Sequence, residues 1–362
     1  MSCGLLTTLR RALTSTRTNQ QSKMDMLVKQ SIEIVQRNQR TTVPWKPDEP
    51  YAQPCYTWTG IEWQALTTSK QDGSKPSPRQ FRPSCIALYS WNIDFMLPFP
   101  DSRMRLAVRH LEGMIAKQPA STATIVHLNE CLASDIKLLK SNFWIRENFK
   151  MTDVDTSNWQ SGHYGTTTLI DKRLELQSCF RVHYSKTYME RDALFVDINI
   201  DTTAKPLRFC NTHAESLANE PAFRPPQIAL CASYMRDPSV HGAVLAGDLN
   251  AIQPFDKHLH ADNELQDAYL ETGGDEDDEE GHTWGQQAAT VQRQRFGTSR
   301  MDKVFYCGDV VCTLFERFGM DVEVEDDAER KEIMELGFEK AWVTDHLGVM
   351  AVFDLNGMLH ST

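Results

Sequence analysis

The stretch from Val244 to Asn250 places the strongest constraint on the fold, because its residues change from apolar to polar within a few positions. Its sequence is VLAGDLN, and a short apolar run that ends at a turn-forming Gly is typical of a buried strand. Asp248 and Asn250 stand at alternate positions, so both side chains can point the same way where the strand leaves the core. A carboxylate can bind a metal ion or accept a proton from water, while a carboxamide orients a reactant without adding charge. The pair therefore suits the attack of water on a phosphate, although Asp and Asn at a strand end are also common in turns.

The composition limits the classes of protein that need to be considered. Of the 362 residues, 41% are hydrophobic, which is enough for a sizeable core. The net charge of -11 argues against coating nucleic acid through bulk electrostatics. The nine Cys residues form no CxxC pair, which disfavours a disulfide framework or a structural zinc site and favours a reducing compartment. No apolar stretch has the ~18 residues that a membrane span requires, so we expect no membrane span.

The first 80 residues are expected to form an N-terminal extension, and residues 81–357 a catalytic domain. Residues 24–38 have the apolar spacing of a short helix, and the region that follows is rich in Pro, Ser and Trp and ends in a linker over 70–83. Tyr56, Trp58 and Trp63 predict a strand or two packed on the main domain. The first 24 residues are basic and contain no acid, which resembles a mitochondrial transit peptide, with a disordered basic tail as the alternative. We expect an intracellular protein of the nucleus or cytoplasm, with mitochondria as the alternative.

From about residue 84 the sequence alternates between buried strands and amphipathic helices. Strands are expected at 86–91, 123–128, 165–170, 193–200, 207–211, 244–247, 301–306 and 347–353, and helices are expected to begin near 101, 134 and 227. A helix separates some strands, whereas others follow one another as in hairpins. This pattern predicts an α/β fold of two packed sheets flanked by helices, rather than a doubly wound parallel sheet. The chain has no GxGxxG or Walker-type loop to support a nucleotide cofactor.

Polar side chains stand at the ends of five of the expected strands. The groups are Asn92 with Asp94, Glu130, Asn211 with His213 and Glu215, Asp248 with Asn250, and Asp345 with His346. Each group alone could be a cap, a turn or a core histidine, but capping hardly explains the same placement at five strands. Buried carboxylates are costly unless a cation or hydrogen bonds compensate them. Because the set is rich in oxygen and has no thiolate, it favours Mg²⁺ or Mn²⁺ over zinc.

Several short motifs occur in a defined order along the chain. They are Trp91-Asn92-Ile93-Asp94, Asn129-Glu130, Thr212-His213-Ala214-Glu215-Ser216, Gly247-Asp248-Leu249-Asn250, His282-Thr283-Trp284, Arg300-Met301-Asp302-Lys303 and Thr344-Asp345-His346. This set resembles the endonuclease/exonuclease/phosphatase superfamily and is most similar to the 5′-tyrosyl-DNA phosphodiesterases. The resemblance covers roughly residues 84–356 and implies a two-sheet α/β sandwich with the site at one rim. It also implies a Mg²⁺-dependent phosphodiesterase that acts on a 5′-phosphotyrosyl or related adduct at DNA ends, in DNA repair.

The resemblance further implies which residues bind the metal ion and activate water. Glu130 matches the direct Mg²⁺ ligand, and the residues expected around the ion and its waters are Asn92, Asp94 and Asp345. Asp248 matches the residue that orients or deprotonates the attacking water, and Asn250 helps to place that water. His346 matches the histidine that contacts the scissile phosphate, and Asp302 matches the carboxylate that orients this histidine.

Three further positions are implied to face the substrate, and one departs from the pattern. Tyr164 and His213 match phosphate-facing positions, and Trp284 matches an aromatic residue that lines the substrate channel. The tyrosyl-DNA branch usually has an Arg two residues after the Asn of GDxN, where this chain has Ile252. We expect the missing phosphate contact to come from elsewhere, with Arg300 and Lys303 as the candidates.

The same motifs also bear on alternative functions. The same chemistry could serve an apurinic-site or general nuclease, or a sphingomyelinase-like lipid phosphodiesterase, although no clear apolar membrane-binding loop is visible. Inositol phosphatases carry WCDR where this chain has RMDK, which disfavours that branch. A non-enzymatic binding module on a dead nuclease fold is disfavoured because the metal, water and histidine positions are all filled. The acidic run over 275–280 is interpreted as a solvated loop.

Overall fold

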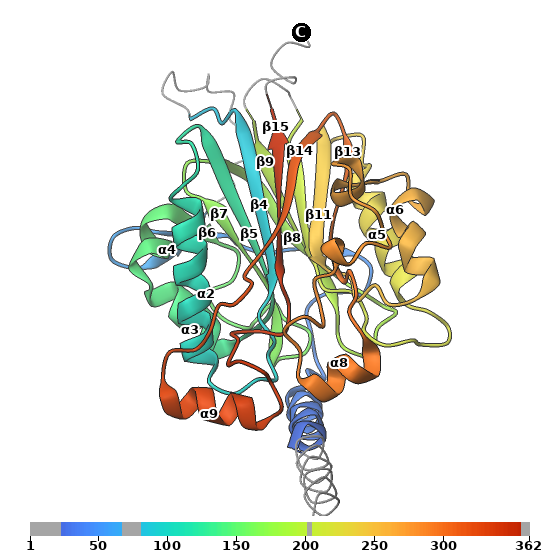
Figure 1. Ribbon diagram of the computed structural model, residues 1–362. Coiled ribbons are helices and arrows are strands. Elements are labelled where there is room, and N and C mark those ends of the chain that lie inside the picture. Colours follow the sequence, from blue (N-terminus) through green and yellow to red (C-terminus); the bar gives the residue numbers. More distant parts are fainter. Residues whose placement is uncertain (1–22, 67–80, 201–204, 356–362) are drawn as a thin grey trace, which may run out of the picture.

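Two mixed β-sheets lie face to face at the centre of the molecule (Figure 1). The computed structural model describes residues 23–66, 81–200 and 205–355. One sheet has the order β1 (Pro50–Ala52), β8 (Glu175–His183), β9 (Asp192–Asn199), β10 (Leu207–Thr212), β11 (Gly242–Asp248), β13 (Asp302–Gly308) and β12 (Gln266–Asp267). The other has the order β14 (Val311–Phe318), β15 (Gly348–Asp354), β4 (Cys85–Asn92), β5 (Thr122–Leu132), β7 (Tyr164–Asp171), β6 (Phe149–Met151), β2 (Tyr56–Trp58) and β3 (Trp63–Ala65).

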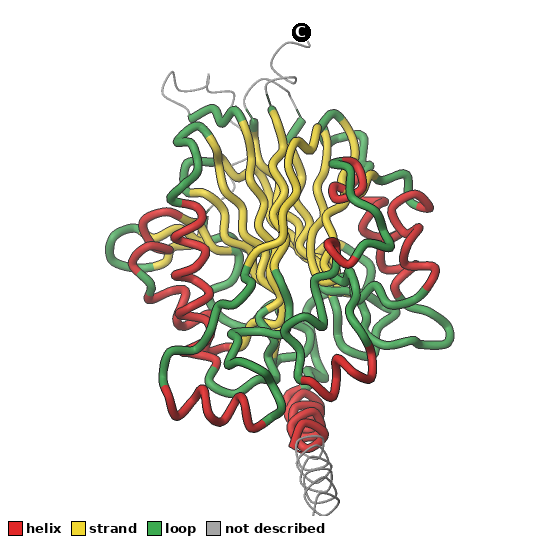
Figure 2. Tube along the Cα trace, viewed as in Figure 1, coloured by secondary structure: helices red, strands yellow, loops and turns green. Residues whose placement is uncertain are grey.

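Helices cover the outer face of each sheet (Figures 1 and 2). The helices α2 (Pro100–Ile115), α3 (Ala133–Ser141) and α4 (Phe143–Asn148) lie beside the eight-stranded sheet, and α5 (Arg224–Met235) and α6 (Leu259–Asp262) lie beside the seven-stranded sheet. Three further α-helices are α7 (Ala268–Glu271), α8 (Thr290–Phe296) and α9 (Asp327–Glu335), and residues 23–38 are also helical. The predicted α/β sandwich of two sheets flanked by helices is thus confirmed.

The central strands are buried on both faces, which explains their continuous apolar sequences. In β4, Ile86 and Leu88 belong to the core between the sheets, whereas Tyr89 and Trp91 belong to the core under α2. Towards the end of β4, Asn92 continues the inter-sheet series, because side chains alternate along a strand. The inter-sheet layer therefore changes from apolar to polar in the direction in which β4 runs.

The expected strands from residue 86 onwards are present, but the sequence interpretation missed the short strands β6 and β12 and the longer strands β8 and β14. Along β14 most side chains are partly or fully exposed, so the strand lacks the apolar run of a central strand. The expected helix at 24–38 is confirmed, since residues 23–38 are helical. The strands near Trp58 and Trp63 are β2 and β3, which extend the eight-stranded sheet beyond β6.

Two sequence expectations lie wholly or largely outside the described residues. The segment that resembles a transit peptide falls mostly within residues 1–22, and most of the expected linker falls within 67–80. The boundary between an extension and a catalytic domain at residue 80 stays a prediction. Within the described ranges, no helix is both long enough and apolar enough to cross a lipid bilayer.

Candidate active site

Strand pairing brings the polar strand ends to one rim of the sandwich. β4 runs parallel to β5 and β10 runs parallel to β11, so the carboxyl ends within each pair lie at the same edge. Asn92 is thereby paired with Asn129, and the antiparallel pairing of β11 with β13 places Asp248 beside Asp302. The side chain of Asn129 also links the two sheets, because its Oδ1 accepts the backbone N–H of Asp248 at 2.9 Å.

Asp248 is held in a fixed orientation by its neighbours. Its Oδ2 accepts a hydrogen bond from Nδ2 of Asn92 at 2.9 Å, and its Oδ1 accepts one from the backbone N–H of Asn250 at 2.8 Å. Nε2 of His213 lies 3.3 Å from the same Oδ2. Although burial acts to raise the pKa of Asp248, nearby His346 and His213 and the N–H of Asn250 lower it below its usual value. Asp248 is therefore a buried carboxylate that stays ionised.

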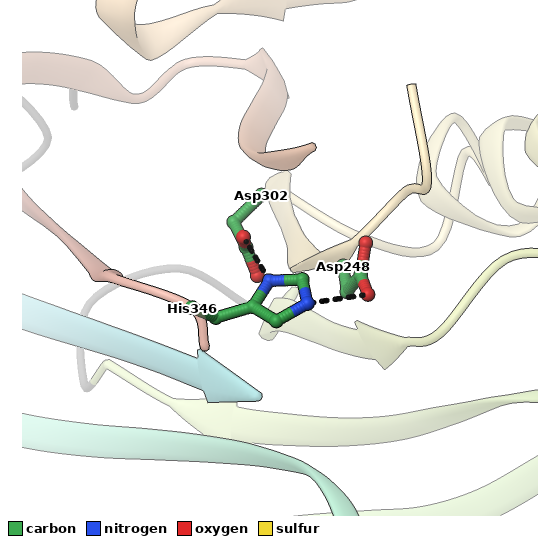
Figure 3. Close-up of side chains that lie close together, drawn as sticks. All are labelled: Asp248, Asp302 and His346. Carbon is green, nitrogen blue, oxygen red and sulfur yellow. Dashed lines mark hydrogen bonds and ion pairs between the residues drawn. The ribbon is translucent and has the colours of Figure 1, made fainter. Parts of the chain in front are cut away.

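His346 lies between two carboxylates (Figure 3). Its Nδ1–H donates to Oδ2 of Asp302 at 2.8 Å, and its Nε2 faces Oδ2 of Asp248 at 3.7 Å. Burial disfavours the imidazolium, but Asp302 and Asp248 outweigh burial and raise the pKa of His346 well above its usual value. These carboxylates favour the protonated form of His346, in which Nε2–H can donate to a phosphate oxygen.

The Asp302 contact predicts a measurable pH effect. Replacement of Asp302 by Asn removes one of the carboxylates that raise the pKa of His346, so that pKa should fall. If the imidazolium is the active form, activity declines as pH rises through this pKa, and the alkaline limb of kcat/KM should move to lower pH. At pH 8 the loss should be on the order of 10–100-fold, as for other groups that orient a functional histidine. A pH–rate profile whose alkaline limb does not move would contradict this role.

A second group of carboxylates lies beside this histidine. Oδ1 of Asp345 is 3.8 Å from Nε2 of His346, and its Oδ2 accepts the indole N–H of Trp284 at 2.7 Å. Glu130 lies where the register of β5 against β7 shifts, with a φ of 59°. Its Oε2 accepts the backbone N–H of Phe95 at 3.0 Å. Burial, together with Asp345 and Glu130, raises the pKa of Asp94 to about 8.

These carboxylates fit a divalent cation. Burial and mutual repulsion among Asp94, Glu130 and Asp345 are the conditions that a bound cation relieves, and oxygen ligands are those that Mg²⁺ and Mn²⁺ prefer. Among the described residues, the three do not form a group whose ligand atoms all lie within 4.8 Å; that spacing is met by Asp248, Asp302 and His346. In the latter group Nδ1 of His346 is already hydrogen-bonded to Oδ2 of Asp302, which is the geometry of a carboxylate that orients a histidine. We therefore keep Glu130, Asp94 and Asp345 as the predicted ligands.

Two arginines that the sequence analysis did not identify shape the site. The buried guanidinium of Arg103 donates to the backbone carbonyls of Pro98, Ile93, Val343, Asp94 and Leu97, and so fixes the loop that carries Asp94. Arg191 donates to Nδ1 of His213, so Nε2 of His213 carries the hydrogen that faces Asp248. In the sequence, Arg103 stands next to the apolar residues of α2. This position was the only sequence signal that the arginine would be buried.

The predicted substrate-facing aromatic residues have their polar atoms occupied by the protein. The hydroxyl of Tyr164 donates to the carbonyl of Met189 at 2.8 Å, and its ring stacks on Phe95 with 4.3 Å between centroids. The guanidinium of Arg191 lies 5.3 Å from the ring centroid of Tyr164. Trp284 uses its indole N–H to hold Asp345. Tyr164 and Trp284 can therefore meet a substrate through their rings only, and that role stays a prediction.

The predicted contact of Arg300 with the substrate is not supported by the structure. Its buried guanidinium pairs with Asp267 at 2.8 Å and also with Glu276. The Nζ of Lys303 lies 2.8 Å from the same Glu276. Both cations are thus neutralised within the protein, because one carboxylate of the acidic run docks onto them. The interpretation of 275–280 as a solvated loop agrees with the exposure of the other five acids, but Glu276 is partly buried.

Comparisons with known proteins agree with this arrangement. The model of the endonuclease/exonuclease/phosphatase family matches residues 89–346. No curated protein matches the sequence of the chain. Similar solved structures include D. rerio TDP2 complexed with a single-strand DNA product (17% identity, TM-score 0.56, covering 75% of this chain and 99% of that one) and truncated Caenorhabditis elegans TDP2 (19%, 0.55, 76% and 99%). A mannosyl-6-phosphatase of Bacteroides thetaiotaomicron is also similar (13%, 0.51, 74% and 99%). At these identities the likeness shows a shared fold.

Proposed function

Because this chain belongs to the endonuclease/exonuclease/phosphatase family, whose members are hydrolytic enzymes, we propose that it is a divalent-metal-dependent phosphodiesterase acting at DNA ends. A 5′-phosphotyrosyl adduct is the leading substrate, on the strength of the WNID and THxES motifs. The observation that carries the proposal is the pair of Asp248 and His346: an ionised carboxylate and an imidazolium face each other 3.7 Å apart at the rim. This pair provides the base and the cationic donor that hydrolysis of a phosphodiester requires.

Different residues of the chain have separate roles in the proposed reaction. Asp248, fixed by Asn92 and Asn250, orients or deprotonates the attacking water. His346, held by Asp302, donates from Nε2 to an oxygen of the scissile phosphate and stabilises the charge that develops there. A Mg²⁺ or Mn²⁺ ion held by Glu130, Asp94 and Asp345 would supply a Lewis acid for the phosphate oxygens.

A local basic and aromatic surface supports a nucleic acid strand as the substrate despite the net charge of -11. Arg293, Arg295 and Phe296 are exposed on α8, and the guanidinium of Arg295 lies 4.9 Å from the ring centroid of Phe296. The ring of Phe296 is 6.4 Å from that of Trp284, which holds Asp345 of the site. Aromatic rings and arginines together are typical of surfaces that bind single strands. The TDP2 structure with a single-strand DNA product has the same fold, which is consistent with this proposal.

The function is tested with a panel of phosphodiesters in Mg²⁺ and in EDTA. The panel contains 5′- and 3′-tyrosyl oligonucleotides, an abasic duplex and sphingomyelin vesicles. We expect Mg²⁺-dependent release of tyrosine from the 5′ adduct. Hydrolysis of the abasic duplex or of sphingomyelin in its place would establish one of the alternative substrates. The absence of any hydrolysis would contradict the proposal.

Metal binding also predicts a change in thermal stability that does not depend on activity. Mg²⁺ should raise the melting temperature, because a ligand at 100 times its dissociation constant stabilises the folded state by about 2.7 kcal/mol. Replacement of Asp94 by Asn should raise the melting temperature of the metal-free protein, because it removes a buried carboxylate that Asp345 and Glu130 repel. The same change should reduce the stabilisation by Mg²⁺. Equal Mg²⁺ shifts in both proteins would exclude Asp94 as a ligand.

A further inference from the structure

We propose that residues 38–53, which we call the N-terminal strap, position the loop that leads into Tyr164 and thereby support substrate binding. This loop, residues 152–163, joins β6 to β7 without a helix or strand of its own. The N-terminal strap lies outside residues 89–346, which the family model matches, so the family match does not account for it. The inference rests on the proposed phosphodiesterase function, in which Tyr164 is expected to face the substrate.

The first residues of the N-terminal strap bind the backbone of the loop. The guanidinium of Arg40 donates to the carbonyl of Thr156 at 2.7 Å and to the carbonyl of Trp159 at 2.8 Å. A loop that has neither a helix nor a strand needs partners of this kind for its backbone polar groups. The carbonyl oxygen of Asn38 lies so close to Gly162 that a Cβ added there would be 2.5 Å from it. Residues 38–40 therefore lie directly against the loop at two separate places.

Trp45 makes a second set of contacts with the same loop. Its indole N–H donates to Oε1 of Gln160 at 2.6 Å. Its ring stacks on that of His183, with 3.9 Å between the centroids and 5° between the planes. His183 in turn donates from Nε2 to the carbonyl of Asn158 at 3.0 Å. Trp45 is buried, and it therefore contacts the loop directly at Gln160 and acts on Asn158 through His183.

The N-terminal strap is itself fixed to the seven-stranded sheet. β1, near its end, pairs with β8 in antiparallel register. The backbone N–H of Asp48 donates to the carbonyl of His183 at 2.7 Å. Gln53 donates to the carbonyl of Thr152 at 3.0 Å, and its Oε1 accepts Nε–H of the buried Arg181 at 3.1 Å. The loop is therefore held against a part of the chain that has its own place in the fold.

The loop in turn fixes Tyr164 beside the predicted metal ligands. Oγ of Ser161 accepts the backbone N–H of Tyr164 at 2.9 Å and donates to the carbonyl of the same residue at 2.8 Å. The ring of Tyr164 stacks on Phe95, whose backbone N–H donates to Glu130. A shift of the loop would therefore move a ring that is expected to meet the substrate.

The N-terminal strap also contacts the segment that binds the hydroxyl of Tyr164. The side chain of Gln39 is hydrogen-bonded to the carboxylate of Glu190. Glu190 follows Met189, whose carbonyl accepts the hydroxyl of Tyr164 at 2.8 Å. Two segments thus fix Tyr164, one at its backbone and one at its hydroxyl, and the N-terminal strap contacts both. We therefore assign Arg40 and Trp45 as positioning residues for substrate binding.

Replacement of Arg40 by Ala tests this inference, because it removes the donor to two loop carbonyls and leaves Asp248 and His346 in place. We expect KM for a 5′-tyrosyl oligonucleotide to rise about tenfold, as the loss of hydrogen bonds from a charged group implies, while kcat stays within about twofold. Arg40→Lys should recover part of the loss, because an ammonium group lacks the fork that reaches both carbonyls. Trp45→Phe keeps a ring on His183 but loses the N–H, and it should also raise KM.

Amide hydrogen exchange provides a measurement that does not depend on activity. In Arg40→Ala, residues 156–164 should exchange about tenfold faster than in the wild type, whereas exchange in β11 should not change. Lys46→Ala is the matched control, because Lys46 belongs to the N-terminal strap but its exposed side chain pairs with Glu49 at 3.5 Å. This variant should have the KM and the loop exchange of the wild type.

The outcomes separate this inference from the proposed function. A folded Arg40→Ala variant with wild-type KM, or with unchanged exchange of residues 156–164, would overturn the positioning role. A lower melting temperature without a change in KM would overturn it as well, because it would show that Arg40 contributes to stability alone. If the wild type hydrolyses no phosphodiester, the proposed function fails, and the exchange of residues 156–164 still decides whether the N-terminal strap holds the loop.

Discussion

Replacement of Asp248 by Asn is expected to lower kcat for a 5′-tyrosyl oligonucleotide by a factor on the order of 10²–10⁴. The amide keeps the size of the side chain, and its oxygen can still accept a hydrogen bond from Asn92. It cannot accept a proton from water, and it removes one of the three carboxylates that raise the pKa of His346. The measurement is kcat at saturating substrate and Mg²⁺.

The matched control for this variant is Asp309→Asn, because the side chain of Asp309 is exposed at the far end of the β11–β13 pair. Its kcat should equal that of the wild type. The melting temperature of Asp248→Asn should show that the protein is folded under the assay conditions. A folded Asp248→Asn variant with wild-type kcat would exclude this carboxylate from the reaction.

Replacement of His346 by Gln should have an effect of similar size, with kcat lower by on the order of 10²–10⁴. Gln can donate a hydrogen bond but carries no charge, so the phosphate loses its cationic partner. Because His346 and Asp248 act on one transition state, the double variant should be hardly slower than either single variant. His258→Gln, at an exposed histidine, is the matched control. If the losses of kcat in the two single variants multiply in the double variant, the two residues act independently.

The sequence was sufficient to predict the two-sheet architecture and the convergence of strand ends at the rim. Both depend on local patterns: an apolar run such as VLAGD forms a strand buried on both faces, and polar residues just after it must lie where the strand leaves the core. Parallel pairing then brings Asn92 next to Asn129. β14 escaped detection because it lies at a sheet edge, where most of its side chains meet solvent and no apolar run is required.

The partners of the charged residues could not be predicted, because they depend on contacts between distant parts of the chain. Arg300 stands next to Met301 and Asp302 in a motif that resembles a substrate-binding one, yet its charge is used by Asp267 and Glu276. Nothing in the local sequence distinguishes Glu276 from the five other acids of its run. Arg191 lies 22 residues from His213 along the chain and meets it only after β9 and β10 have paired.

The position of a bound Mn²⁺ ion tests the central claim most directly. In crystals soaked with Mn²⁺, the anomalous signal should identify one ion in contact with Glu130 and with Asp94 or Asp345, next to Asp248 and His346. An ion bound instead among Asp248, Asp302 and His346, or no ion at saturating Mn²⁺, would contradict the site described here.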